Sequence, residues 1–342
     1  MSIPISQPLE PMEAQLVDVV PNGKEWQYEP KWDGFRCIAF RDGKRLELQS
    51  KSGQSLTRYF PELVAALLKL PAKQFVLDGE IVIPVGQRLS FDDLLQRIHP
   101  AQSRVLKLSQ LHPAWMVVFD LLVDARGNPL LDKPLKHRRR ELERFAKAFD
   151  ECESLWISPA TLDVKVARRW FRGAGGSTDG VIAKRLDLPY EAGERTGMQK
   201  VKPIHSVDCV VGGFRYAEGK KIVGSLLLGL YDDQGLLNHV GFTSALSEVE
   251  RQRLTPKLVK RIKPPGFTGN KPGGPSRWST KRSSEWQPLK PDLVVEVSYD
   301  HFTGERFRHG TGLLRWRPDK AAAQCTIDQI EQGGTSLRLL HS

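Results

Sequence analysis

The apolar positions of the first 200 residues follow two different spacings. Between residues 58 and 70 they recur every three or four positions, as on one face of a helix. Elsewhere they form short runs rich in β-branched and aromatic residues, which predict strands; Asp42-Gly43, between two such runs in 26–50, predicts a hairpin turn. Ser90, three positions before Asp93, resembles a helix cap. We predict further strands over 75–85, 115–123, 179–187 and 198–203, and further helices over 133–149 and 163–172.

Beyond Pro203 short strands dominate the pattern, with one helix predicted over 247–262. The stretch 263–278 is too rich in Pro and Gly for a regular element. About five strands with one interposed helix suit a small Greek-key barrel of the oligonucleotide-binding (OB) type. Because 342 residues exceed what one compact core usually serves, we predict an α+β protein of two domains, residues 1–204 and 205–342.

Composition narrows the class of protein. No apolar run reaches the roughly 18 residues of a membrane span, and the N-terminus has neither the basic nor the apolar region of a secretion signal. We therefore expect a cytoplasmic protein without membrane association. Cys37, Cys152, Cys209 and Cys325 are widely spaced, which excludes zinc-ribbon spacing and favours buried, reduced thiols.

The net charge of +11 is unevenly distributed. From Glu250 to Lys290 the chain has eleven Lys or Arg residues and two Glu residues, so this segment alone carries +9. The solvated face of a helix usually mixes charges of both signs, whereas a polyanion-binding surface does not. The segment therefore favours a nucleic acid as partner.

Several charged residues interrupt strands that are otherwise apolar. They are Lys31, Asp78, Glu80, Asp120, Asp179, Lys184, Lys200 and Lys202. Each alone could be a solvent-facing charge on an edge strand. Together they provide a lysine nucleophile, carboxylates for Mg²⁺ and cations for phosphates, as phosphoryl or nucleotidyl transfer requires.

The order and spacing of these residues resemble the ATP-dependent DNA ligases among the covalent nucleotidyltransferases, most closely bacterial ligase C and the ligase module of ligase D. Lys31-Trp32-Asp33-Gly34 matches the motif K-x-D-G, and Arg36 follows it as in the relatives. The remaining motifs match Ser50-Lys51-Ser52-Gly53, Asp78-Gly79-Glu80, Phe119-Asp120-Leu121, residues 179–184, Lys200-Val201-Lys202 and Arg317-Pro318-Asp319-Lys320. Lys51 stands where an arginine is common and Asp179 where many relatives have glutamate.

The resemblance implies a nucleotidyltransferase domain of antiparallel sheets flanked by helices, followed by an OB-fold barrel that carries the last motif. It implies that Lys31 takes AMP from ATP and passes it to the 5′-phosphate of a nick, which the 3′-hydroxyl then seals. Glu80 and Asp179 would bind Mg²⁺ or Mn²⁺. The residues implied in binding ATP are Glu29, Arg36, Lys51, Glu80, Phe119, Lys184, Lys200, Lys202, Arg317 and Lys320.

Lys31 must lose its proton to act as a nucleophile, because the ordinary pKa of lysine is about 10.4. We expect Mg²⁺ together with Lys184, Lys200 and Lys202 to provide the cationic, partly desolvated setting that lowers this pKa. The last motif is expected to orient the pyrophosphate of ATP, with Lys202-Pro203 as a hinge between the domains.

Alternatives remain at this point. A capping guanylyltransferase or an RNA ligase shares the K-x-D-G chemistry, and a nucleic-acid-binding module with an inactive site is a second class. A NAD-dependent ligase is disfavoured because only 30 residues precede Lys31 and no cysteine cluster exists. The resemblance implies a monomer in the bacterial cytoplasm, associated with the nucleoid. Its partners would be nicked duplex DNA and proteins of end joining or base-excision repair.

Overall fold

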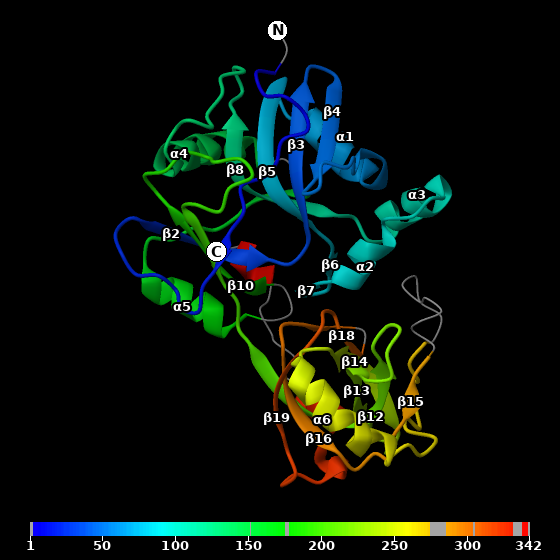
Figure 1. Cartoon of the computed structure of the whole chain (residues 1–342). Helices are drawn as coiled ribbons and strands as arrows, with labels where there is room; N and C mark the ends of the chain where they lie inside the picture. Colours follow the sequence, from blue (N-terminus) through cyan, green and yellow to red (C-terminus); the bar gives the residue numbers. More distant parts are fainter. Residues whose placement is uncertain are drawn as a thin grey trace. The chain divides into compact units, whose positions relative to one another are not determined.

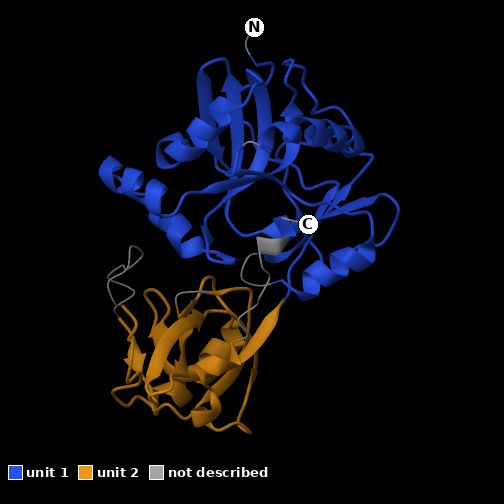
Figure 2. Cartoon of the chain, turned by 180° about the vertical axis from the view of Figure 1, so that it is seen from behind, with its two compact units in different colours: residues 1–203, 332–342 blue, residues 204–331 orange. Residues whose placement is uncertain are grey.

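The computed structural model describes residues 3–150, 152–174, 178–273, 285–303, 305–330 and 337–340. The chain divides into two compact units, one formed by residues 1–203 and 332–342 and the other by residues 204–331 (Figure 1, Figure 2). The described tail, residues 337–340, therefore belongs to the first unit, whereas the sequence pattern grouped it with the second domain.

Two sheets form the framework of the first unit. The larger has the strand order β4-β3-β5-β8-β9 and the smaller the order β1-β11-β10-β2. Their strands are β1 (Gln15–Leu16), β2 (Trp26–Trp32), β3 (Phe35–Asp42), β4 (Arg45–Ser50), β5 (Gln74–Val82), β8 (Trp115–Val123), β9 (Leu155–Ile157), β10 (Thr178–Arg185) and β11 (Met198–Val201). The short strands β6 (Pro84–Val85) and β7 (Arg88–Leu89) pair only with each other.

The expectation of antiparallel sheets needs correction at two edges. β9 lies parallel to β8, and β1 lies parallel to β11, while the other neighbouring strands of these two sheets are antiparallel. Between β8 and β9 the chain passes through a helix, and such a crossover lets two paired strands run in the same direction. The α+β class itself is confirmed, with mixed sheets.

Two of the five α-helices described in the first unit begin at a capping side chain. The five are α1 (Pro61–Lys69), α2 (Phe91–Gln96), α3 (Gln102–Leu111), α4 (Leu135–Phe145) and α5 (Val164–Arg172), with short 3₁₀ turns at Thr57–Tyr59 and Ala146–Phe149. As predicted, Ser90 Oγ accepts a hydrogen bond from Asp93 N at the start of α2. Asp163 caps α5 in the same way. Helix α3 was not predicted, because Val105 and Ser109 are its only buried residues and its apolar pattern is weak.

Helix α5 fixes the direction in which the side chains of β2 point. It packs on β2 and β10 and shares a buried cluster with Tyr28 and Val181. Because side chains alternate along a strand, the neighbours of Tyr28 on β2 face the other side of the sheet. Glu29 and Lys31 are therefore directed away from α5.

The second unit is built on one main sheet with the order β14-β13-β12-β16-β19. Its strands are β12 (His205–Tyr216), β13 (Val223–Tyr231), β14 (Leu237–Thr243), β15 (Gln287–Pro288), β16 (Val294–Tyr299) and β19 (Gly312–Trp316), with a small hairpin of β17 (Phe302–Thr303) and β18 (Arg306–Phe307). Helix α6 (Glu248–Val259) begins with a complete capping box between Ser247 and Glu250 and packs on β13. Short 3₁₀ turns lie at Ala322–Gln324, Ile327–Gln329 and, in the first unit, Leu337–Leu340.

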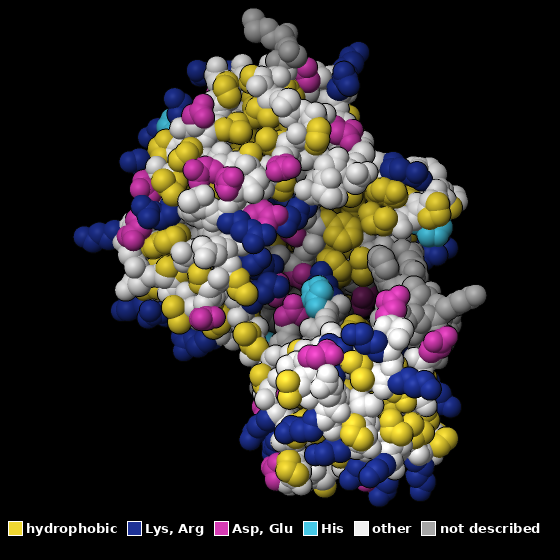
Figure 3. Space-filling model, in the orientation of Figure 1, with side chains coloured by type: hydrophobic (Ala, Val, Ile, Leu, Met, Phe, Trp, Pro, Cys, Tyr) yellow, Lys and Arg dark blue, Asp and Glu magenta, His cyan; other side chains and the backbone are white. Residues whose placement is uncertain are grey.

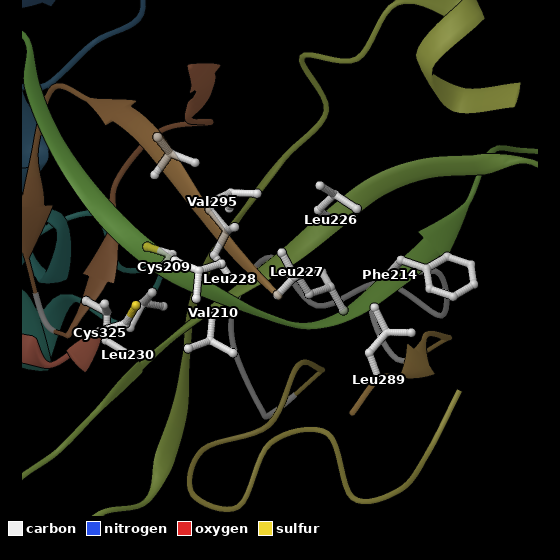
Figure 4. Close-up of a cluster of buried hydrophobic side chains, with 14 of the residues drawn as sticks. Cys209, Val210, Phe214, Leu226, Leu227, Leu228, Leu230, Leu289, Val295 and Cys325 are labelled. Atoms are coloured by element: carbon white, nitrogen blue, oxygen red, sulfur yellow. The ribbon is translucent and has the colours of Figure 1, made fainter. Parts of the chain in front are cut away.

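An apolar cluster holds this second sheet together. Figure 4 shows side chains from several strands meeting around Val210 and Leu228, with the thiols of Cys209 and Cys325 among them. All four cysteines are free thiols; three are buried and Cys152 is half-buried, in partial disagreement with the expectation that all would be buried.

The predicted barrel is only partly visible in the strand pairing. Within the described residues, β14 and β19 stand at the two ends of the sheet and form no ladder with each other. Isolated hydrogen bonds nevertheless join β14 to Thr311, the residue directly before β19: Thr311 N donates to Phe242 O (3.4 Å), and Thr243 Oγ1 donates to Thr311 O (2.8 Å). Among the described residues no helix is long and apolar enough to cross a membrane.

Candidate active site

Lys31 lies near the end of β2, beside the start of β10. Its ammonium donates a hydrogen bond to Asp179 Oδ2 (2.8 Å), and Lys202 Nζ lies 2.7 Å from the same oxygen. The Asp179 side chain is only 8% exposed. Strand β10 approaches β11 closely at Gly180, where φ is +125° and a side chain would collide with the carbonyl of Val201. Pairing of the strands thus joins groups that are far apart in the sequence.

A cavity of about 210 Å³ opens next to Lys31. It is lined by residues of the N-terminal segment and of strands from both sheets of the first unit. The lining residues that the sequence predicted are Glu29, Lys31, Arg36, Lys51, Glu80, Phe119, Lys184 and Lys200. Asp179 and Lys202 are joined to this set through the ion pair with Lys31. The predicted residues of the first unit therefore converge on one site.

One end of the cavity combines an ion pair with an aromatic ring. Lys184 Nζ lies 2.9 Å from Glu29 Oε1, which also accepts a hydrogen bond from Gln27 Nε2 (2.9 Å). Lys184 Nζ also lies 4.5 Å from the centroid of the Phe119 ring, and the Arg36 guanidinium carbon lies 4.6 Å from it. The face of an aromatic ring attracts cations at such distances. Phe119 is buried, so its ring is held in one position beside the cavity.

Arg36 is oriented by a buried network. Its Nε and Nη2 donate to the two carboxylate oxygens of Asp78 in a bidentate arrangement, and each donor–acceptor distance is 2.6 Å. Asp78 also accepts from Tyr190 Oη (2.7 Å), and Tyr190 Oη accepts from Met12 N (3.0 Å). Since Arg36 Nη2 donates to Met12 O as well, this network fixes the N-terminal segment against the cavity.

The pKa of Lys31 is set here by the charges of the protein alone, whereas our expectation included Mg²⁺. Burial alone would lower the pKa of Lys31, but the charges of Asp179, Glu80 and Asp33 outweigh burial, and the pKa is raised. The cations expected to lower this pKa are partly neutralised, because Lys184 pairs with Glu29 and Lys202 pairs with Asp179. Without a ligand, Lys31 is therefore held as an ammonium ion.

The two carboxylates near Lys31 have opposite pKa shifts. Burial raises the pKa of Glu80 to about 7, despite the charges of Lys31 and Arg36. Burial also acts to raise the pKa of Asp179, but direct contact with Lys31 and Lys202 lowers it overall. Asp179 is thus ionised at neutral pH, while Glu80 can gain or lose a proton there.

Near the cavity two cations pair with the carboxylate of Glu13, and a third cation, Lys200, lines the cavity. Glu13 Oε1 lies 2.7 Å from Lys51 Nζ, and Glu13 Oε2 lies 3.0 Å from Arg195 Nη2. Burial together with the charges of Lys31, Lys202 and Lys51 lowers the pKa of Lys200. The rim thus carries an excess of positive charge that an anion would relieve.

The last predicted residues, Arg317 and Lys320, form a cluster of their own in the second unit. Asp208 on β12 accepts from Arg317 Nη1 (3.0 and 3.1 Å) and from Lys320 Nζ (2.7 Å). Asp319 accepts from Arg317 Nε (3.0 and 3.1 Å) and Nη2 (2.8 Å). The two cations are therefore held together by carboxylates of the same unit.

Comparison with known proteins decides the family. Residues 10–202 match the ATP dependent DNA ligase domain, and residues 219–320 match the ATP dependent DNA ligase C terminal region. The chain is 42% identical to DNA ligase C2 of Mycolicibacterium smegmatis, over 97% of this chain and 96% of that protein. It is 40% identical to DNA ligase C of Mycobacterium tuberculosis, with the same coverage. The chain belongs to the ATP-dependent DNA ligases.

A solved structure of a Lig E DNA ligase has the same fold. The match covers 92% of this ligase and 100% of that chain, with 14% sequence identity and a TM-score of 0.56. The predicted resemblance is thus confirmed. The alternatives of a capping enzyme, an RNA ligase and a binding module without activity are excluded in favour of an ATP-dependent DNA ligase that seals nicks.

The carboxylates of this ligase suit one metal ion with phosphate ligands. Among the described residues, no group of three His, Cys, Asp or Glu side chains is arranged to hold a metal. Mg²⁺ is usually bound by one or two carboxylates and completes its coordination with water and substrate phosphates. Glu80 and Asp179, both acting on Lys31, provide such a pair of oxygen donors. The residues therefore fit a Mg²⁺ or Mn²⁺ ion that is shared with ATP.

Sequence reasoning missed three residues that organise the sites of this ligase. Glu13 pairs with two rim cations, Tyr190 holds Asp78, and Asp208 holds the last motif. Tyr190 lies in a loop without a repeating pattern, so only the structure reveals its contact. Asp208 had a usable signal, because it is a charged residue at the start of the apolar run DCVVGGF, and the same reasoning identified Lys31 and Asp179.

Proposed function

We propose that this ligase forms a lysyl-AMP intermediate on Lys31. The observation that carries this proposal is that Lys31 borders a cavity also lined by Glu29, Phe119 and Lys200, groups suited to a nucleotide and its phosphates. Lys31 Nζ attacks the α-phosphorus of ATP, the bond to the bridging oxygen breaks, and pyrophosphate leaves. The product has a phosphorus–nitrogen bond between AMP and Lys31.

The attack requires the neutral amine, so Lys31 must first release its proton and its bond to Asp179. In this proposal Glu80 and Asp179 hold Mg²⁺ or Mn²⁺. The ion supplies positive charge beside the carboxylates and phosphates, which favours the neutral form of a neighbouring amine. Lys200 and Lys202 bind the α-phosphate and stabilise the negative charge that develops on it. Lys51 contributes a further cation at the rim of the cavity.

The nucleoside end of ATP would lie near the aromatic ring. Phe119 stacks against adenine, with its buried position limiting the entropy lost on binding. Glu29 and Lys184 contribute polar groups at the same end of the cavity, and Arg36 contacts the nucleoside from its fixed position over Phe119. In the structure, the Phe119 ring is in contact with the cations of Arg36 and Lys184, and adenine would bind beside this ring.

We propose that the second unit acts as an OB-fold domain that brings Arg317 and Lys320 to the pyrophosphate of ATP. The strand order and the bonds of Thr311 to both Phe242 and Thr243 support a barrel of this type. Movement about residues 202–203 would then withdraw the two cations before DNA binds.

After adenylylation, AMP passes from Lys31 to the 5′-phosphate of the nick, forming a phosphoanhydride and restoring the amine. The 3′-hydroxyl then attacks the 5′-phosphate, AMP leaves, and the phosphodiester bond is complete. By resemblance to ligase C we further propose a monomeric enzyme of bacterial DNA repair, working at the nucleoid with proteins of end joining or base-excision repair.

The test is incubation with ATP or GTP labelled at the α-phosphate, with and without Mg²⁺ or Mn²⁺, followed by denaturation of the protein. We expect label from ATP to remain on the denatured chain only when the metal is present, and peptide mapping to place it on Lys31. Label on another residue, or no label from a preparation that seals nicks, would refute the assignment of Lys31.

A further inference from the structure

Asp208 connects the two cations of the last motif. It lies on β12, directly opposite Glu296 of β16, and is only 8% exposed. Its carboxylate accepts bonds from Arg317 Nη1 and Lys320 Nζ at 2.7 to 3.1 Å, and each of these side chains is about one-fifth exposed. One buried carboxylate therefore holds both cations at the surface of the second unit.

A second interaction fixes the position of Asp208 itself. Gln329 Nε2 donates to the backbone carbonyl of Asp208 (3.2 Å), and Gln329 Oε1 accepts from Lys320 Nζ (3.2 Å). Gln329 thus links β12 to Lys320. Asp319, two positions after Arg317, accepts hydrogen bonds from the Arg317 guanidinium. Both cations are fixed by at least two partners.

Both cations retain donors for a ligand. Arginine has five N–H groups and a lysine ammonium has three. Within the described part of the chain, Arg317 uses Nε–H and one N–H of Nη2 toward Asp319, and its Nη1 bonds to both oxygens of Asp208; Lys320 uses two N–H groups. One N–H group of Arg317, on Nη2, and one of Lys320 can therefore bind phosphate oxygens without breaking the contacts to Asp208. Asp208 can therefore position the two cations for a ligand. If Asp208 blocked them instead, each cation would have to break its bond to Asp208 before it could bind phosphate.

We propose that Asp208 is a positioning residue that presents Arg317 and Lys320 as one pair to the pyrophosphate group of ATP. This inference rests on the proposed role of the last motif. Arg317 and Lys320 both bond to Oδ2 of the same carboxylate, so the two cations lie near each other, as binding to two adjacent phosphate groups requires. Without the carboxylate, the two side chains would repel each other and spread over many rotamers. Binding of the pyrophosphate would then have to order both side chains again.

The experiment compares Asp208→Asn, Asp208→Glu and wild type in the full-length ligase. The control variant is Asp292→Asn, which removes a carboxylate paired with Arg261 and Lys290 in the same unit. Three quantities are measured. They are the KM for ATP in self-adenylylation, the pyrophosphate concentration that half-saturates release of AMP from adenylylated protein, and the single-turnover rate of sealing a pre-adenylylated nick. Thermal unfolding of each variant shows whether it is folded.

We expect Asp208→Asn to raise the ATP KM and the half-saturating pyrophosphate concentration by about 10- to 100-fold, as a misplaced binding group does. Sealing of the pre-adenylylated nick should stay within about twofold of wild type, since no pyrophosphate takes part. Asp208→Glu restores the charge and should recover part of the loss, which keeps the test valid if Asp208→Asn does not fold. Asp292→Asn should behave as wild type.

Other outcomes overturn the inference. If Asp208→Asn binds pyrophosphate more tightly, Asp208 sequesters the cations rather than presenting them. If the adenylylation and sealing rates fall in equal proportion, or if Asp208→Glu recovers nothing, Asp208 serves the fold alone. The double variant Arg317→Ala, Lys320→Ala separates the two proposals. If this variant adenylylates normally, the proposed role of the last motif fails. If it is impaired while Asp208→Asn is not, only the inference about Asp208 fails.

Discussion

Two carboxylates of this ligase, Glu80 in the first unit and Asp319 in the second, both lie close to basic side chains. Their pKa values are nevertheless shifted in opposite directions. Burial raises the pKa of Glu80 to about 7, although Lys31 and Arg36 are nearby. Direct hydrogen bonds from Arg317 lower the pKa of Asp319 to about 2. The Asp319 side chain is 63% exposed, so desolvation hardly opposes those bonds.

The difference reflects two ways of arranging charge. In the first unit, charged groups line a cavity, and at Glu80 the cost of removal from water exceeds the attraction of the nearby cations. In the second unit, Asp208, Glu296, Arg315 and Arg317 form a row across β12, β16 and the end of β19, where contacts between neighbours dominate. We therefore expect substitutions in the first unit to act through protonation and chemistry, and those in the second through positioning and salt.

The largest expected effect is complete loss of covalent labelling in Lys31→Ala. The variant lacks the nucleophile, and the fold should persist because Lys31 borders a cavity rather than filling the core. The measurement is retention of α-labelled AMP on denatured protein. Lys107→Ala, which removes an exposed lysine of α3, is the matched control and should label as wild type. Labelling of Lys31→Ala would show that another residue is the nucleophile.

The second prediction separates the two units by reaction step. Arg317→Ala with Lys320→Ala should slow self-adenylylation by orders of magnitude, since the pair orients a charged leaving group. The same variant should still seal a nick whose 5′ end is already adenylylated. Lys200→Ala should impair both reactions, because Lys200 lines the cavity and is proposed to bind the α-phosphate throughout. The measurement is the single-turnover rate of each step.

Equal loss of both rates in the double variant would contradict a mobile pair of cations. The proposed closure of the second unit over ATP would then fail with it. A sealing rate unaffected by Lys200→Ala would instead remove Lys200 from the α-phosphate.

The strands and most candidate site residues of the first unit were predictable, because charged residues that interrupt apolar strand patterns stand out in the sequence. The sequence pattern placed Lys31 and Asp179 on or beside predicted strands but did not pair those strands; in the structure β2 pairs with β10, and Lys31 Nζ lies 2.8 Å from Asp179 Oδ2. The charge state of Lys31 was not predictable. It depends on which carboxylate each lysine contacts, and a sequence does not specify the pairing of Lys184 with Glu29 or of Lys202 with Asp179.

In the second unit, sequence reasoning found the cations but not their partner. Arg317 and Lys320 were identified by a motif, whereas Asp208 lies over a hundred positions earlier and meets them only through β12, β16 and β19. Parts of the basic segment remain outside the described residues, namely Arg277, Lys281 and Arg282. Its described portion is a capped helix followed by an irregular stretch, as the pattern predicted.

The third prediction concerns pH and tests whether burial controls the pKa of Glu80. An acid whose folded-state pKa is raised binds more protons in the folded than in the unfolded state between the two pKa values. For Glu80 this window runs from 4.5 to about 7, so its contribution to the free energy of unfolding falls as the pH rises through it. We expect wild type to lose about 2–3 kcal/mol relative to Glu80→Gln between about pH 5 and pH 8. Urea unfolding without nucleotide or metal measures this difference.

Asp319→Asn provides the contrast, since the pKa of Asp319 is lowered to about 2 and it stays ionised across that pH range. Its stability relative to wild type should not change between the two pH values. A Glu80→Gln variant that is equally independent of pH would show that the Glu80 carboxylate is better solvated than its surroundings suggest.

The smallest expected effect, per residue, is on the salt dependence of DNA binding. Lys257, Lys260 and Lys263 are exposed in or just after α6, and no ion pair involves them within the described residues. Arg261 already pairs with Asp292 (2.8 Å) and should contribute less. Each lost phosphate contact should flatten the slope of log affinity against log salt by about 0.9, which changes affinity about 3.5-fold between 50 and 200 mM.

Replacing these four residues by Gln should therefore flatten the slope by up to about 2.7 from the lysines, with a smaller addition from Arg261. The matched control replaces Lys165, Arg168, Arg169 and Arg172 of α5, which are also exposed and carry the same total charge in the first unit. An unchanged slope in the α6 variant would show that this segment faces away from DNA. If both variants flatten the slope equally, DNA responds to the net charge of the ligase rather than to a surface of the second unit. A loss confined to the α6 variant would assign phosphate binding to exposed cations of the second unit, in keeping with the contact-dominated charges there.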